Sequence, residues 1–154
     1  MKIAVCIKRV PDMDIRFSIS PDGKSLDPRD LKFDLSDFDG YAVEAALQFN
    51  EKQGPGEVVV ISLGPDAAQE TIRKALGIGA DRGILLKVDE MPFDGMATAA
   101  ALAAELKDGG YDLILFGRAA NDTGNQSVGP MTAHLLGLPC VSAVSKLDIA
   151  GGKG

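Results

Sequence analysis

The residues best suited to chemistry lie in one polar stretch, FGRAANDTGNQSVGP, which runs from Phe116 to Pro130. It follows the apolar run YDLILFG and leads into VGPMTAHLLG, whose apolar residues have helical spacing. Gly117 lets the backbone turn tightly, and the amides from Val128 onward are free at the start of a helix. Such a stretch can hold a phosphate or a ribose without a lysine; an ordinary turn with helix-capping side chains is the alternative. Its hydrogen-bonding side chains are those of Asn121, Asp122, Thr123, Asn125, Gln126 and Ser127.

The sequence lacks the motifs of other nucleotide sites, metal sites and serine hydrolases. No Lys-Ser or Lys-Thr follows Gly124, and its spacing from Gly117 is wrong for a Walker A loop. The glycines of GIGADRG, at 77–83, precede an expected strand and favour a helix end with a turn. His134 is the only histidine and lies in no cluster of metal ligands, and no serine stands in GxSxG. The sequence therefore indicates a nucleotide-binding module without visible catalytic machinery.

The elements that must position this stretch can be read from recurring short apolar runs. Segments with apolar residues at helical spacing separate the runs, near 43–50, 68–76, 96–106 and 128–135. The runs predict strands at 2–7, 57–63, 82–88, 111–117 and 140–147. Because the strands are apolar along most of their length and alternate with helices, we expect an α/β fold. It would be a doubly wound, mainly parallel sheet, Rossmann-like in its three layers.

Ligands of such sheets lie beyond the carboxyl ends of the strands. This rule selects the segments that follow strands, at 8–35, 64–66, 89–93 and 118–126. The first is long and polar, and it is open whether it is functional or a solvated decoration. Within it, SISPDGKSL is typical of a hairpin that turns at Pro21, Asp22 and Gly23. At the helix starts, Ser36 and Asp39 have the spacing of a capping box, and Asp94 is suited to cap the third helix.

The composition of the chain indicates which classes of protein it can belong to. The chain has 154 residues, of which 45% are hydrophobic and 25% charged, as expected for one globular domain. A net charge of -6 excludes the electrostatic footprint of a nucleic-acid-binding protein. No run reaches the roughly eighteen apolar residues of a membrane span, and Met1 and Lys2 lead straight into a strand, so we expect a cytoplasmic protein without direct membrane insertion. Cys6 and Cys140 lie in apolar runs, which favours reduced core thiols.

Four blocks of the sequence, in register from Met1 to about residue 150, match one known family. They are KRVPD at 8–12, SDFDGYAVEAAL at 36–47, SLGPDAAQETIRKALGIGADRGILL at 62–86 and FGRAANDTGNQSVGPMTAHLLGLP at 116–139. The combination QETIRKALGIGADRGI is long and unusual, so chance is a poor explanation. The chain resembles the electron transfer flavoprotein beta subunit.

This resemblance implies a function. Beta subunits of the family pair with an alpha subunit that holds the redox-active FAD, and they bind a second adenine nucleotide themselves. In many members that nucleotide is AMP, which has no redox chemistry and serves structure and assembly. Electrons arrive from acyl-CoA and related flavin dehydrogenases and leave to a membrane quinone oxidoreductase. The resemblance thus implies half of a heterodimeric electron carrier.

The resemblance also implies site residues. The AMP contacts of the family fall on the end of the first strand, the start of the first helix, the end of the second strand and the polar stretch. Phe38 matches an aromatic residue that approaches the alpha subunit's flavin in relatives; a hydrophobic staple of the first helix is the alternative. The expected cofactor-binding residues are Cys6, Ser36, Asp37, Phe38, Asp39, Val60, Ser62, Leu63, Gly117, Arg118, Ala119, Ala120, Asn121, Asp122, Thr123, Gly124, Asn125, Gln126, Ser127 and Val128.

Departures from the family pattern keep alternatives open. The motif CNQTGQM of many single-flavin relatives aligns with 125–131, where its Asn-Gln-Thr is replaced. The VGP at 128–130 is similar to members that bind FAD in the beta subunit too, and those members bifurcate electrons from NADH to ferredoxin and a second acceptor. A free-standing adenine-nucleotide-binding domain is a third possibility.

The given sequence ends with LDIAGGKG, at a point where the members of this family continue with a further C-terminal segment. We expect a nucleotide-binding domain at 1–150 and a flexible end at 151–154, with the family's C-terminal segment absent. Truncation is favoured over a shortened paralogue because a glycine-rich tail is a plausible break point.

Overall fold

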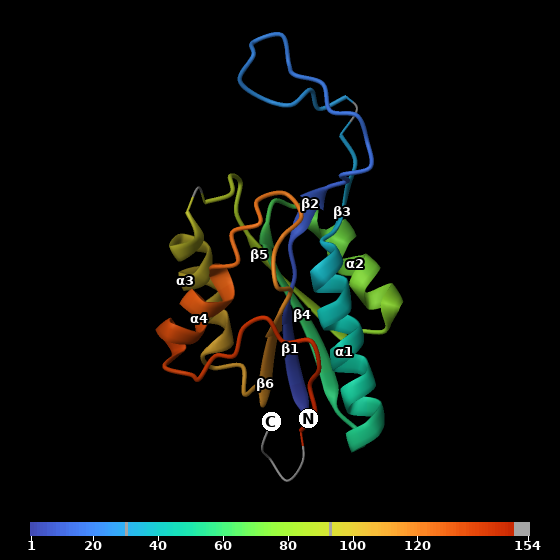
Figure 1. The fold of residues 1–154 in the computed structure, drawn as a ribbon, viewed down its shortest axis with the longest axis vertical. Coiled ribbons are helices and arrows are strands. Elements are labelled where there is room, and N and C mark those ends of the chain that lie inside the picture. Colours follow the sequence, from blue (N-terminus) through green and yellow to red (C-terminus); the bar gives the residue numbers. More distant parts are fainter. Residues whose placement is uncertain (30, 93, 150–154) are drawn as a thin grey trace.

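The computed structural model describes residues 1–29, 31–92 and 94–149, in which strands and helices alternate (Figure 1). The strands are β1 (Lys2–Cys6), β2 (Arg9–Pro11), β3 (Phe33–Leu35), β4 (Glu57–Gly64), β5 (Arg82–Lys87) and β6 (Leu113–Phe116). The helices are α1 (Asp37–Gln53), α2 (Ala68–Ile78), α3 (Gly95–Leu106) and α4 (Val128–Leu136). The strands expected at 2–7, 57–63, 82–88 and 111–117 are confirmed, and so are the helices expected near 43–50, 68–76, 96–106 and 128–135.

The main sheet is parallel and has the strand order β5-β4-β1-β6. Its register pairs Cys6 with Ile61 on one side and with Phe116 on the other, so the tips of β1 and β6 end level. The chain moves outward from β1 through β4 to β5 and then places β6 on the opposite side of β1. The strand order therefore reverses at β1 and β6, which makes their carboxyl ends the topological switch point.

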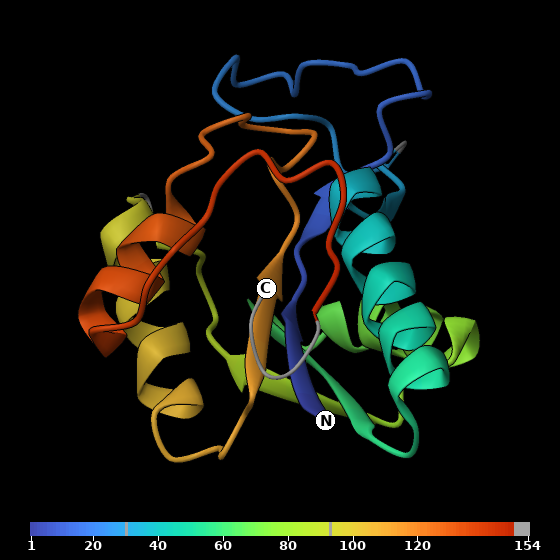
Figure 2. The ribbon, with the colours of Figure 1, turned by 60° about the horizontal axis from the view of Figure 1, so that its bottom comes forward.

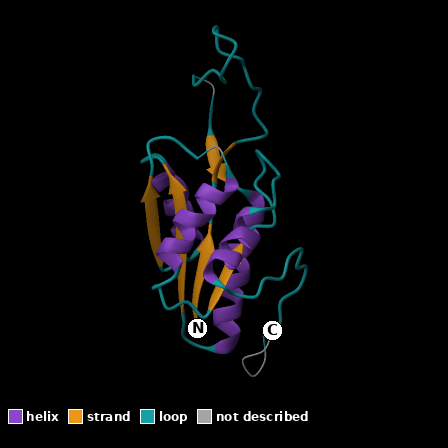
Figure 3. Cartoon of the chain, turned by 90° about the vertical axis from the view of Figure 1, so that its left-hand side faces the viewer, coloured by secondary structure: helices purple, strands orange, loops and turns teal. Residues whose placement is uncertain are grey.

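Helices cover both faces of this sheet, with α3 and α4 on one side and α1 and α2 on the other (Figure 2), and Figure 3 views the chain from the left-hand side of Figure 1. Side chains alternate between the two faces of a strand, so each face has its own core. On one face, Val43 of α1 and Ile72 of α2 pack with Val60 of β4. On the other, Leu102 of α3 packs with Ile61 of β4, and Val128 and Leu136 of α4 pack against the same cluster. The predicted doubly wound, three-layer α/β fold is confirmed.

A long arm projects beyond the strand tips between β2 and β3 (Figure 1). Strands β2 and β3 form an antiparallel pair at its base. Farther out, Ile19 and Leu26 form an isolated antiparallel bridge, and the Gly23 amide donates to the Ser20 carbonyl at 2.8 Å. Gly23 has a φ of +69°, a conformation that glycine adopts without strain. The hairpin expected around Pro21 to Gly23 is confirmed.

The fifth strand expected at 140–147 is wrong, because this segment is irregular. It leaves α4 and runs across to the far end of α1 (Figure 2), where Gln53 Nε2 donates to the Ile149 carbonyl at 3.0 Å. A strand is stabilised by a ladder of backbone hydrogen bonds, and the segment pairs with no strand among the described residues. Val141 and Val144 consequently remain exposed, at 82% and 53%.

The two cysteines differ in burial, because one lies in a strand and the other in the irregular segment. Cys6 is a buried free thiol in β1, as expected of a core residue. Cys140 lies in the irregular segment and is exposed, so the expectation that it is a core thiol is wrong. The flexible end expected at 151–154 lies outside the described residues, as does residue 150.

Candidate functional site

The polar stretch that follows β6 begins at the topological switch point. We call residues 117–127 the β6–α4 loop. The tips of β1 and β6 lie side by side there, and the first turn of α1 packs against them, since the Gly117 amide donates to Asp39 Oδ1 at 3.1 Å. In Figure 2 the loop, in orange, rises from the end of β6 above these tips. This is the edge at which doubly wound sheets bind their ligands.

Gly117 is required by the close approach of β6 to α1. A Cβ at this position would collide with the Asp39 carboxylate and amide and with the backbone of Phe38. Backbone atoms cannot move aside as the end of a flexible side chain can. The glycine therefore allows the loop to start directly against the first turn of α1.

The carboxyl group of Asp39 joins three elements. Its Oδ2 accepts a hydrogen bond from the Lys8 amide at 2.7 Å, just beyond β1, and its Oδ1 accepts the one from Gly117. Only 6% of Asp39 is exposed. Burial raises the pKa of Asp39 to about 7, against the two main-chain hydrogen bonds and the Lys8 charge, which lower it. Burial and the charge of Asp39 also raise the pKa of the Cys6 thiol, which keeps this thiol protonated and unreactive.

Asn121 supplies the contacts that were expected from a capping box at the start of α1. Ser36 precedes the helix but makes no capping hydrogen bond with its side chain. Instead, Asn121 Oδ1 accepts from Ser36 Oγ at 2.9 Å and from the Asp37 amide at 3.2 Å, and Asn121 Nδ2 donates to Asp37 Oδ2 at 2.8 Å. The capping-box prediction is wrong because the groups of the box have other partners: Ser36 Oγ donates to Asn121, the Ser36 amide donates to the Lys8 carbonyl, and the Asp39 carboxylate accepts from the Lys8 and Gly117 amides. By contrast, Asp94 caps α3 as expected, accepting from the Ala97 amide at 2.8 Å.

Lys8 brings a positive charge to the loop. Its ammonium lies 2.8 Å from each carboxylate oxygen of Asp122, and the side chains are 33% and 24% exposed. From the sequence we expected a site without a lysine, so Lys8 was not identified as part of it. The only available signal was its position, two residues after the tip of β1 in the long segment 8–35.

The second half of the β6–α4 loop differs from the first half in its hydrogen bonds. The side chains of Asn125, Gln126 and Ser127 make no hydrogen bond with any residue that the structure describes, and the first two residues are exposed. Gln126 has a φ of +54°, which is uncommon for a residue other than glycine. Ser127 lies near Gly95 at the start of α3, so the first turns of α3 and α4 adjoin each other here. These polar groups are therefore available for a ligand.

The other expected site residues are divided between the tips and the core. Cys6 and Leu63 are buried near the carboxyl ends of β1 and β4, and Ser62 is fully buried with no hydrogen-bond partner for its Oγ among the described residues. The side chain of Val60 belongs to the core, so the structure does not bring it to the tips. Phe38 is 39% exposed. In the loop, Arg118 is exposed, Ala119 and Ala120 are half-buried, and Thr123 and Gly124 are exposed.

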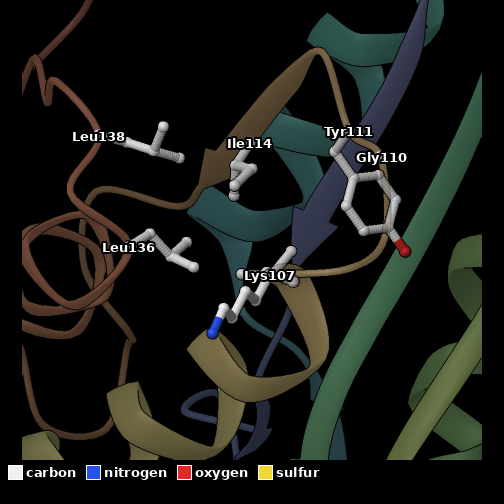
Figure 4. A pocket seen from close by; sticks show the side chains of 7 residues that line it. Lys107, Gly110, Tyr111, Ile114, Leu136 and Leu138 are labelled. Atoms are coloured by element: carbon white, nitrogen blue, oxygen red, sulfur yellow. The ribbon is translucent and has the colours of Figure 1, made fainter.

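A separate hollow lies away from the strand tips. It has a volume of about 200 Å³ and is lined by Leu106, Lys107, Gly110, Tyr111, Ile114, Leu136 and Leu138 (Figure 4). Its residues come from the end of α3, the connection from α3 to β6, the first half of β6, and the end of α4 with the segment after it. It contains none of the residues expected to bind a cofactor. No group of three or more metal-ligating side chains occurs in the described parts of the chain.

The family model of the electron transfer flavoprotein domain matches residues 25–153. The chain belongs to the electron transfer flavoprotein family. The match includes β6, the whole β6–α4 loop and the start of α1, which meet at the switch point, and it does not include β1.

Known relatives carry the name of the beta subunit, which confirms the resemblance seen in the sequence. "Electron transfer flavoprotein subunit beta" of Syntrophomonas wolfei is 40% identical over 153 residues, which cover 99% of this chain and 60% of the relative. The proteins of the same name from Bradyrhizobium diazoefficiens and Homo sapiens are 38% and 33% identical, and the matches cover 98% and 99% of this chain. The chain spans about 60% of the length of these relatives. Within the described residues, no helix has the length and apolar character needed to cross a membrane.

Proposed function

We propose that the chain is the nucleotide-binding part of an electron transfer flavoprotein beta subunit and holds AMP at the switch point. The observation that carries the proposal is the position of the β6–α4 loop. Its polar residues follow the tip of β6, next to the tip of β1 and beside the first turn of α1. In an open α/β sheet this is the place where nucleotides bind.

The residues present fit an adenylate. Asn125, Gln126 and Ser127 keep their hydrogen-bonding groups free of partners in the described chain, and Ser62 Oγ is a buried polar atom without a partner near the end of β4. Oriented amides and neutral side chains can stabilise an anion without a cation in direct contact. AMP would then serve structure and assembly, and it would take no part in electron transfer.

In this proposal the chain works with an alpha subunit that holds FAD. The flavin, when bound, supplies one-electron transfer, and this chain supplies a surface that helps to keep water from it. Phe38 and Tyr41 form that surface at the start of α1, with ring centroids 6.2 Å apart in an edge-to-face arrangement. Both are exposed, at 39% and 70%. Electrons would come from acyl-CoA or related dehydrogenases and pass to a quinone oxidoreductase, with the carrier in the cytoplasm and not itself an enzyme.

The test is the nucleotide content of the heterodimer. The chain would be produced with its alpha subunit, the purified complex denatured, and the released compounds separated by chromatography. We expect AMP and FAD in equal amounts. A complex that releases no adenine nucleotide other than the FAD of the alpha subunit would overturn the proposal.

A second candidate is a beta subunit that binds FAD itself and takes part in electron bifurcation. The VGP at 128–130, which opens α4 directly after the loop, favours it because this motif resembles that of family members that bind FAD in the beta subunit. Two FAD and no AMP per heterodimer, together with NADH-dependent reduction of ferredoxin, would support this candidate. A stable monomer that binds an adenine nucleotide without any alpha subunit would instead support a free-standing domain.

A further inference from the structure

Lys8 connects three parts of the candidate site. Its amide donates to Asp39 Oδ2 at 2.7 Å, and its carbonyl accepts from the Ser36 amide at 3.2 Å. These two bonds fix the chain just after β1 to the first turn of α1. Its ammonium then reaches across to Asp122, which is 114 residues away in the sequence. One residue thus links β1, α1 and the β6–α4 loop.

The loop is fastened in its first half only. Asp39 holds the Gly117 amide, Asn121 is bound to the start of α1, and Asp122 is bound to Lys8. Beyond Asp122, the side chains of Asn125, Gln126 and Ser127 have no hydrogen-bond partner in the described chain. The pair of Lys8 and Asp122 is therefore the last attachment before the free half of the loop.

The charges around Lys8 argue against a direct contact with a phosphate. Two carboxyl groups, Asp39 and Asp122, lie against this one lysine. The ammonium is already neutralised by Asp122, and a phosphate placed there would meet that carboxylate at close range. Like charges at such distances repel. The ion pair is better suited to hold the loop than to bind an anion.

We propose that Lys8 is a positioning residue of the nucleotide site. Through Asp122 it fixes the first half of the β6–α4 loop, so that the free half presents its donors to the ligand in a defined place. The inference rests on the proposed function in one respect only, namely that this loop holds a nucleotide.

The experiment compares Lys8→Met, Asp122→Asn and their combination in the complex with the alpha subunit, after removal of the bound nucleotide. Binding of AMP and of adenosine is measured by calorimetry, and exchange of the amides at 117–122 by mass spectrometry. We expect each single change to weaken both ligands by the same factor, about 1.5-fold to fivefold, which is the range of a partly exposed ion pair. The double variant should be no weaker than the weaker single variant, and Lys8→Arg should restore binding and amide protection.

A matched control comes from the opposite edge of the sheet. Lys87 of β5 pairs with Asp66 at 2.7 Å, and β5 is the edge strand farthest from β6. The Lys87→Met variant should leave ligand binding and the exchange at 117–122 unchanged.

Two results would overturn the proposal. If Lys8→Met weakens AMP and leaves adenosine unaffected, Lys8 contacts the phosphate and does not act by positioning. If exchange at 117–122 is the same in Lys8→Met and the wild type, the pair does not fasten the loop. The exchange measurement remains decisive even if the wild-type complex binds neither ligand, a result that would refute the proposed function and not the role of Lys8.

Discussion

At the scale of single residues, Asp39 links stability to pH. Its carboxyl group is buried, and burial raises its pKa from 3.8 to about 7. The folded state therefore favours the protonated form. The stability that Asp39 contributes is complete below the ordinary aspartate pKa and is lost as the pH rises through about 7. We expect the free energy of unfolding to fall by about 2–3 kcal/mol between pH 5 and pH 8 on account of this residue.

Urea unfolding of the wild type and of Asp39→Asn at both pH values checks this expectation. The carboxyl groups of Asp27 and Asp34 have lowered pKa values, so they are ionised in both states across this window and do not obscure the result. The variant should show a much smaller difference between pH 5 and pH 8. If the free energy of unfolding changes by the same amount between pH 5 and pH 8 in both proteins, Asp39 does not titrate in this range.

Gly117 can be tested by adding one methyl group. In Gly117→Ala the new Cβ would collide with the Asp39 carboxylate and the backbone of Phe38. We expect a loss of about 1–3 kcal/mol in the free energy of unfolding, as for other overpacked positions. The matched control is Gly77→Ala, in α2, where nothing lies near the added Cβ. That change should stabilise the protein by about 0.5–1 kcal/mol, because alanine favours a helix. A Gly117→Ala protein as stable as the wild type would mean that β6 and α1 are not in such close contact.

Phe38 tests the contact with the partner's flavin. Its ring is 39% exposed beside Tyr41. In the heterodimer, Phe38→Ala should change the fluorescence or the reduction potential of the flavin, because water would gain access to the ring system, and the AMP content should stay the same. Tyr41→Phe keeps the edge-to-face pair and serves as the control. Unchanged flavin properties in Phe38→Ala would mean that Phe38 only packs on α1.

The sequence identified many of these residues by type but not by contact. The polar side chains of the β6–α4 loop stand in one stretch, so their shared location could be predicted. That Asn121 reaches the start of α1, and that Lys8 reaches Asp122, depends on the side-by-side arrangement of β1 and β6. Residues more than eighty positions apart leave no local pattern that predicts such a pair.

At the scale of elements, α1 begins with a cap supplied from another part of the chain. Asn121 accepts from the Asp37 amide, whereas α3 is capped locally by Asp94. We expect Asn121→Ala and Asp94→Ala each to lower the free energy of unfolding by about 1 kcal/mol, the usual cost of a lost cap. Only Asn121→Ala should also speed amide exchange at the start of the β6–α4 loop. Slower or unchanged exchange there would contradict the role of Asn121 as a link between loop and helix.

Some helices and strands could be predicted from local sequence patterns alone. The end of α2 was predicted from GIGADRG, and Gly79 does end this helix with a φ of +139°. Strands β1 and β4 were predicted because buried parallel strands are apolar throughout. The segment 140–147 has the same apolar character but lies in no strand. Apolar residues predict that a segment can be buried, but whether it joins a sheet depends on a neighbouring strand with free backbone groups.

At the scale of the whole molecule, two cores on opposite faces of one sheet hold the strand tips in place. The strand order could not be derived from the sequence, since right-handed crossovers allow more than one order. The observed order β5-β4-β1-β6 makes β6 a neighbour of β1, and it thereby puts the β6–α4 loop beside the tip of β1 and the first turn of α1. The fold thereby converts a polar stretch into a site.

The most direct test of the account is a crystal structure of the heterodimer purified with its own nucleotide. We expect an adenylate beyond the tips of β1 and β6, in contact with Asn125 to Ser127 and with the Lys8–Asp122 pair still formed. A nucleotide found elsewhere on this chain, for example in the hollow between Tyr111 and Leu136, or a β6–α4 loop that touches no ligand in the complex, would contradict it.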